Sequence, residues 1–352
     1  MDIHRKSQFF YLFFFCSFGL SCQTGKDYPI VYPFAGTGNM GSANGYRTKA
    51  SFSNLMGVAA DDQGNLYLAD SRNNMIRKID AKGMVTTLAG SGIAGSTDGK
   101  GDTASFFFPA AVAVDKQGFV YVADTHNNLI RKISPDGFVT TLAGRRLYPT
   151  IPGVDKTEMR LDNPDGIAVD RSGNIYVSDW ANDVIRKISS DGKIWHLIGN
   201  GERGAKDGPD SLSSFYLPGG ITVDTAGNIY LADTYNNMIR KILPSGVVTT
   251  LAGKIRKGRD NGKGAEASFF HPAGITIDKQ GNLFVADVGN NLIRKISPDG
   301  RVNVFAGSGK RGAVNGRDTV ASFYRPYGVT TDNKGNLYVA DYLNNQIRRI
   351  SY

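Results

Sequence analysis

The chain has 352 residues, 41% of them hydrophobic, with 41 Lys and Arg against 32 Asp and Glu and a formal net charge of +9. This length exceeds the usual size of one domain, but closed β architectures often run as long. A basic chain could bind nucleic acid, which requires clustered charge. Nucleic acid is not expected as a partner here, because a large share of the basic residues recurs at one repeated position: Arg77–Lys78, Arg131–Lys132, Arg186–Lys187, Arg240–Lys241, Arg294–Lys295 and Arg348–Arg349. We expect that position to be solvated or locally paired.

The first 22 residues differ from the rest of the chain. Basic residues at 4–6 precede an apolar run at 9–20 that is short for a membrane span and typical of a signal peptide. The run ends in FGLSC, which resembles a bacterial lipobox with Cys22 as the lipidated residue. The leucine, however, lies one place nearer to the cysteine than in the usual pattern.

Two interpretations of Cys22 remain: lipidation after cleavage before it, or ordinary secretion with an incidental cysteine. Cleavage there would leave Cys22 as the only cysteine of the mature chain, without a disulfide partner, and lipidation would account for it. We therefore expect a lipoprotein signal peptide at 1–22 and a short tether at 23–28. The protein would be exported and held at the bacterial cell envelope, in the periplasm or at the outer membrane, by a lipid anchor.

The remainder is built from one repeat. The aspartate of each AD or SD pair recurs at steps of 54 or 55 residues: Asp70, Asp124, Asp179, Asp233, Asp287 and Asp341. A constant period of this kind indicates a solenoid or a propeller. The second repeat contains four strand candidates, at residues 111–115, 119–124, 129–133 and 138–144, separated by turns rich in Gly, Asp, Asn and Pro. No helical periodicity is sustained.

Six units of four strands predict an all-β fold, a six-bladed β-propeller of four-stranded antiparallel blades, over residues 29–352. The fourth strand reads VTTLAG or similar in five repeats, and its sixth copy, VYPFAG, lies at residues 31–36. We expect this N-terminal strand to pair with the last repeat, to close the ring and to cover an open sheet edge.

The repeated words PDGIAVD, GNLYVAD and NNLIRKI resemble those of the NHL repeat family. The resemblance covers residues 29–352 and implies the same six-bladed propeller. The departures are Leu55 for the usual proline, Ala111 for the usual glycine and Asp183 for the second asparagine, each in a single blade.

Candidate binding residues lie where the copies disagree. The repeated Asp and Asn residues are interpreted as structural, because Asx side chains bond their own turns. The ADxxNN turns and the long connections share one face of the disc, and variable loops on a rigid scaffold often carry sites. Aromatic residues and arginine are favoured at interfaces. The candidates on this face are Trp180, Tyr327, Tyr342, Tyr235, Arg72, His126, Asp165 and Met56.

Catalytic residues, metal ligands and cofactors are not predicted. A lyase of this propeller class that cleaves hydroxyglycine peptides holds zinc with histidines at the mouth, but none of the matching slots is histidine here: Met56, Ala110, Asp165, Gly219, Ala273 and Tyr327. His126, His196 and His271 occupy three registers of the repeat, so we expect them not to converge on one metal. Lactonase-like propellers hold calcium with carboxylates at the mouth. At the mouth positions of this chain, Asp165 is the only carboxylate that could serve as such a ligand.

The sequence therefore favours a monomeric binding or scaffold module whose ligand is a protein, a peptide or a glycan. The alternative is an envelope hydrolase or lyase with a metal-assisted site at the propeller mouth. Fold alone does not separate these two functions.

Overall fold

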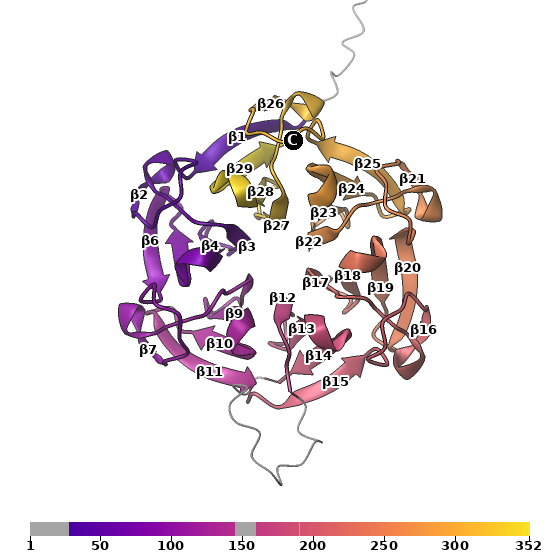
Figure 1. Cartoon of the computed structure of the whole chain (residues 1–352), viewed down its shortest axis with the longest axis horizontal. Helices are drawn as coiled ribbons and strands as arrows, with labels where there is room; N and C mark the ends of the chain where they lie inside the picture. Colours follow the sequence, from indigo (N-terminus) through magenta and orange to yellow (C-terminus); the bar gives the residue numbers. More distant parts are fainter. Residues whose placement is uncertain (1–27, 145–159, 190) are drawn as a thin grey trace, which may run out of the picture.

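A computed structural model describes residues 28–144, 160–189 and 191–352. The predicted signal peptide, Cys22 and nearly all of the tether lie outside these residues. Six antiparallel sheets surround a central axis as the blades of a propeller (Figure 1). The described residues include short 3₁₀ turns but no α-helix, and no helix among them is long and apolar enough to cross a membrane.

Each blade runs from an innermost strand outward. Blade 1 contains β3 (Leu55–Ala60), β4 (Leu66–Asp70), β5 (Met75–Ile79) and β6 (Met84–Ala89). Blade 2 contains β8 (Ala111–Val114), β9 (Val120–Asp124), β10 (Leu129–Ile133) and β11 (Phe138–Gly144). Blade 3 contains β12 (Pro164–Val169), β13 (Ile175–Asp179), β14 (Val184–Ile188) and β15 (Ile194–Ile198).

The second half of the ring repeats this order. Blade 4 contains β17 (Ile221–Val223), β18 (Ile229–Asp233), β19 (Met238–Ile242) and β20 (Val247–Gly253). Blade 5 contains β22 (Pro272–Ile277), β23 (Leu283–Asp287), β24 (Leu292–Ile296) and β25 (Arg301–Ala306). Blade 6 contains β27 (Pro326–Thr331), β28 (Leu337–Asp341), β29 (Gln346–Ser351) and β1 (Ile30–Ala35).

The prediction of four strands per blade was too low for five of the six sheets, which have five strands. The extra strands are two residues long and come from the long connections: β2 (Gly45–Tyr46), β7 (Gly99–Lys100), β16 (Gly208–Pro209), β21 (Gly262–Lys263) and β26 (Gly316–Arg317). Each pairs with the outermost long strand and covers part of an edge that would otherwise present unpaired N–H and C=O groups.

The first and last strands of the described chain lie side by side. β1 pairs antiparallel with β29, in a register that runs from Ile30 opposite Ser351 to Ala35 opposite Ile347. Figure 1 shows β1, in indigo, outside the yellow strands of the last repeat. Blade 6 is therefore assembled from both ends of the described chain.

The hydrophobic core lies between adjacent blades. Each cluster of buried side chains draws on two neighbouring sheets, as where Tyr67 of blade 1 packs in one cluster with Val120 of blade 2. The repeated phenylalanines near the innermost strands fill these layers, and all have 0% exposure: Phe52, Phe106, Phe215, Phe269 and Phe323.

The repeated aspartates are structural, as predicted. In blade 2, Asp124 accepts hydrogen bonds from the backbone N–H of Phe107 (2.8 Å), from Asn127 Nδ2 (2.8 Å) and from Arg131 Nη1 (2.9 Å). The first arginine of the basic pair is locally paired but not solvated, because it has 0% exposure in five blades: Arg77, Arg131, Arg240, Arg294 and Arg348. These arginines therefore contribute to the interior and not to a basic surface.

The second asparagine of each NN pair joins one blade to the next. Asn128 has the left-handed φ of 57°, and its Oδ1 accepts a hydrogen bond of 2.7 Å from the backbone N–H of Asn163 in blade 3. Asp183 makes the same contact with the N–H of Leu217, at 2.6 Å. The same bond is present at the other four junctions. Its acceptor side chain and donor backbone N–H belong to Asn74 and Phe108, Asn237 and His271, Asn291 and Arg325, and Asn345 and Asn54. These bonds fix the residue that enters each innermost strand.

Candidate functional site: the axial mouth

A cavity of about 320 Å³ opens on the axis, on the face that carries the ADxxNN turns. Three kinds of position line it: the first residues of innermost strands, the 3₁₀ turns after the second strands, and the residues just before the innermost strands. The lining residues are Met56, Phe108, Ala110, Thr125, His126, Asn163, Asp165, Trp180, Thr234, Tyr235, His271, Ala273, Val288, Arg325 and Tyr327. We call this cavity the axial mouth.

Six of the eight residues predicted from sequence border the axial mouth: Met56, His126, Asp165, Trp180, Tyr235 and Tyr327. Tyr342 lies beside it, with its ring centroid 6.2 Å from that of Tyr327. Arg72 is exposed and does not border the cavity. The fold thus brings most of the predicted residues together at one end of the axis.

Sequence reasoning missed the residues that precede the innermost strands. Phe108, His271 and Arg325 have φ values of 50°, 49° and 52°, a left-handed conformation that is strained for large side chains. The asparagine of the preceding blade holds each backbone N–H and compensates for this strain. The sequence did contain a signal for these residues. The position directly before the proline is fixed in the repeat, and the residue there varies from copy to copy.

Aromatic rings form the walls. The ring centroids of Tyr235 and His271 are 4.7 Å apart with planes inclined by 25°, and Trp180 meets Tyr235 edge-on at 6.5 Å. On blade 2, His126 is stacked on Phe108 at 4.8 Å with planes inclined by 13°. These contacts limit the rotation of the rings and give the mouth a preformed shape.

Two of the three histidines discussed from sequence border the axial mouth. His126 of blade 2 and His271 of blade 5 both border the axial mouth, although they occupy different registers of the repeat. They share this cavity because the turn after the second strand and the residue before the first strand lie on one face of the ring. The side chain of His196 is not among those described. Within the described part of the chain, no group of three or more His, Cys, Asp or Glu could hold a metal.

The surroundings of both histidines favour the neutral imidazole. Burial lowers the pKa of His126. Burial also lowers the pKa of His271, with a further contribution from the positive charges of Arg325 and Lys257. They can therefore offer one donor and one acceptor nitrogen each, without charge.

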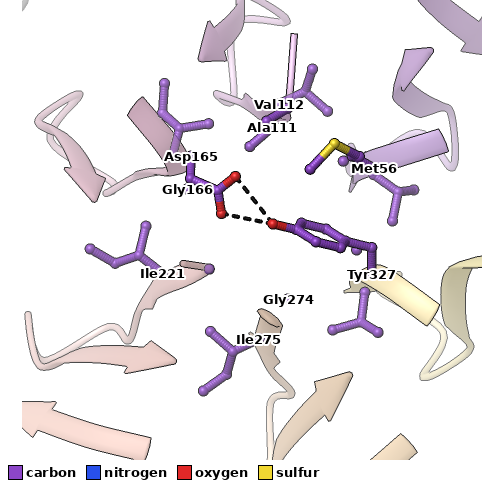
Figure 2. Close-up of a pocket in the computed structure, with 16 residues that line it drawn as sticks. Met56, Ala111, Val112, Asp165, Gly166, Ile221, Gly274, Ile275 and Tyr327 are labelled. Atoms are coloured by element: carbon purple, nitrogen blue, oxygen red, sulfur yellow. Dashed lines mark hydrogen bonds between the residues drawn. The ribbon is translucent and has the colours of Figure 1, made fainter. Parts of the chain in front are cut away.

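One hydrogen-bonded pair crosses the axis. Tyr327 of blade 6 donates its hydroxyl to Asp165 of the opposite blade 3, with Oη 3.2 Å from Oδ1 and 3.0 Å from Oδ2. Figure 2 shows the tyrosine ring extending toward this carboxylate, with Met56 beside it. Burial raises the pKa of Asp165 to about 6, although the bond from Tyr327 opposes this change. Burial and the negative charge of Asp165 also raise the pKa of Tyr327.

The pair of Asp165 and Tyr327 lies between the axial mouth and two further hollows along the axis. Asp165, Tyr327 and Met56 also border a hollow of about 70 Å³ lined by the innermost strands. Farther along the axis, a hollow of about 160 Å³ is lined by later residues of the same strands, among them Ala60, Val114 and Thr330. Asp165 and Tyr327 thus form a floor that a molecule in the mouth would contact.

Comparisons with known proteins agree with the repeat. Residues 215–242 and 269–296 match the NHL repeat, and residues 113–203 match the SMP-30/Gluconolactonase/LRE-like region. The chain belongs to the NHL repeat family. It is 30% identical over 338 residues to NHL repeat-containing protein 2 of Gallus gallus, an alignment covering 83% of this chain and 45% of that protein.

Other family relatives are also longer than this chain. It is 31% identical over 284 residues to the chloroplastic protein SUPPRESSOR OF QUENCHING 1 of Arabidopsis thaliana, covering 76% of this chain and 27% of that protein. The chain therefore spans less than half the length of these two curated relatives. A solved structure of unknown function from Bacteroides thetaiotaomicron superimposes with a TM-score of 0.73 at 20% identity, covering 92% of this NHL chain and 76% of the other. That likeness supports the fold alone.

Proposed function

We propose that this NHL propeller is a binding or scaffold module that holds a ligand or partner in the axial mouth. The observation that carries the proposal is a preformed cavity with aromatic walls and one buried carboxylate on its floor, on the face where the repeats differ. Ligand sites in proteins typically combine apolar walls with a few placed polar groups. The mouth has this composition, and the invariant parts of the repeat do not contribute to it.

Ligand retention tests this function. The full chain would be incubated with an envelope extract, re-purified and analysed by native mass spectrometry, beside a Trp180→Ala, Tyr235→Ala variant and a Lys116→Ala control. Lys116 is exposed and lies on the opposite-face turn. We expect the wild type and the control to retain a bound species that the double variant loses. Retention by a folded double variant, or its loss on Lys116→Ala, would place the site elsewhere.

We also propose that the protein is exported and held at the cell envelope by a lipid on Cys22. The support is the basic and apolar leader, the lipobox-like FGLSC and the lack of another cysteine after residue 22. Cys22→Ser should release the protein from membranes or leave it unprocessed. Mass spectrometry that finds an unmodified N-terminus beyond residue 22 would contradict the anchor.

We further propose that β1 closes the ring and stabilises the whole propeller. Its pairing with β29 and the bond from the Asn54 N–H to Asn345 support this role, because both join repeat 6 to the start of the chain. Without β1, the edge of β29 would be open to solvent or to another chain.

A second candidate function is a hydrolase or lyase that uses the same mouth. It is favoured by the match of residues 113–203 to the SMP-30/Gluconolactonase/LRE-like region and by the pKa of about 6 at Asp165, which suits proton transfer near neutral pH. Metal analysis of the purified protein and a lactonase assay separate the candidates. A stoichiometric metal together with Asp165-dependent turnover would favour the enzyme.

A further inference from the structure

Asp165 differs from the buried aspartates that end the second strands of the blades. Asp70, Asp124, Asp233, Asp287 and Asp341 each lie 2.7–3.0 Å from an arginine nitrogen. Asp165 is only 9% exposed, yet its partner among the described residues is the uncharged hydroxyl of Tyr327. A β-carbon built on Gly219 would lie 3.3 Å from Asp165 Oδ2, so the next blade presents bare backbone to this carboxylate.

An ionised carboxylate in this position lacks a counter-charge. Burying a charge without a partner is costly, and the cost appears here as a pKa raised to about 6. At pH 7 the group is still mostly ionised. The floor of the axial mouth is therefore negatively charged. A positive group placed against Asp165 would compensate for the solvation that the carboxylate loses on burial.

The surroundings of Asp165 suit a positive group of low hydration. Trp180, Tyr235 and Tyr327 border the same cavity, and the faces of such rings attract ammonium groups. Lowered pKa values keep His126 and His271 uncharged. The remaining charged residue of the lining is Arg325, which is exposed to solvent.

Two other ligand chemistries fit less well. Calcium takes six to eight oxygen ligands and magnesium takes octahedral sites, whereas the described lining provides one carboxylate and no metal-binding group of three. A neutral sugar could stack on the rings and donate to Asp165, but its hydroxyls would leave the buried charge uncompensated.

We propose that the axial mouth recognises an organic ammonium group, seated between the aromatic walls and the carboxylate of Asp165. The proposal rests on the proposed function in that the mouth must be the binding site. It adds the chemical class of the ligand. The residues that recognise the ligand are Asp165 by charge, and Trp180, Tyr235 and Tyr327 by their ring faces.

Calorimetric titration of the full chain with choline and with its uncharged carbon isostere, 3,3-dimethylbutan-1-ol, tests the charge directly. We expect choline to bind at least about tenfold more tightly than the isostere. Asp165→Asn should abolish this preference and Asp62→Asn should keep it, since Asp62 is an exposed residue of an opposite-face turn and its replacement removes the same charge. Equal affinities in the wild type, or an unchanged preference in Asp165→Asn, would overturn the proposal.

Choline affinity of the wild type measured at several pH values also tests the role of Asp165, and this test does not depend on the folding of a variant. Choline affinity should fall below pH 6 as Asp165 takes up a proton, while the isostere's affinity should fall less. His126 and His271 would gain positive charge in the same direction, so Asp165→Asn should retain only the histidine part of the fall. Affinity for choline that is constant from pH 7.5 to 5 would contradict the role of the carboxylate.

The two proposals fail in different ways. If the wild type retains an extract ligand that the Trp180→Ala, Tyr235→Ala variant loses, but choline and the isostere bind alike, the mouth is a binding site and the ammonium proposal is wrong. If neither extract ligand nor choline depends on the mouth, both proposals are wrong.

Discussion

Replacing Asp165 with asparagine should stabilise the protein at neutral pH, and the gain should disappear in acid. Asparagine keeps an oxygen to accept the bond from Tyr327 but carries no charge. In the folded protein burial raises the pKa of Asp165 from 3.8 to about 6. Because the folded state binds this proton more tightly than the unfolded chain, the stability that the group contributes is fully present below about pH 4 and is lost as the pH rises through 6.

The size of the effect follows from the same pKa change. The wild type should lose ~3 kcal/mol of unfolding free energy above pH 7 relative to strong acid through this one group. Asp165→Asn should escape that loss, which corresponds to a melting temperature higher by ~4 °C at pH 7.5 for a domain of this size. Near pH 3.5 the two proteins should melt together.

Thermal unfolding followed by circular dichroism at pH 7.5, 5.5 and 3.5 measures this difference. Asp62→Asn serves as the control for removing one negative charge from an exposed site, and its melting temperature should follow the wild type. A variant at Asp165 that melts below the wild type at pH 7.5 would show that the carboxylate stabilises the ring. That result would refute the reasoning from burial.

Three further predictions concern the frame of the propeller and can be checked by the same unfolding assay. Deletion of residues 23–37 should lower the melting temperature markedly, because it removes β1 and exposes the edge of β29; an unchanged value would contradict ring closure. Arg131→Met should cost ~3–5 kcal/mol, because it leaves the buried carboxylate of Asp124 without its cation, and a loss below ~1 kcal/mol would contradict the pairing. Asn128→Ala should cost ~1–3 kcal/mol by leaving the N–H of Asn163 unpaired, whereas Asn128→Asp should cost much less, as the natural Asp183 indicates.

The repeat by itself determines most of the fold. A period of 54 or 55 residues fixes the number of blades, since each repeat buries its faces only against its neighbours. The structural role of Asp124 and its equivalents was also predictable, because a residue repeated six times serves the shared frame. The two-residue outer strands were missed because β7 and its equivalents have no apolar alternation and form only where a connection passes an open edge.

The site depended on the tertiary structure. Sequence comparison among the repeats found Trp180 and Tyr235 because they are aromatic residues at positions where the copies differ. It did not find His271, because only the left-handed backbone before the proline places that residue at the mouth.

The pair of Tyr327 with Asp165 shows most clearly what sequence-based prediction could not find. These residues are 162 positions apart and belong to opposite blades, so no pattern within a repeat links them. Their contact requires the whole ring, with a diameter that lets one tyrosine reach across the axis. The sequence determined the blades and the variable positions, whereas the geometry of the ring alone decided which of those side chains meet.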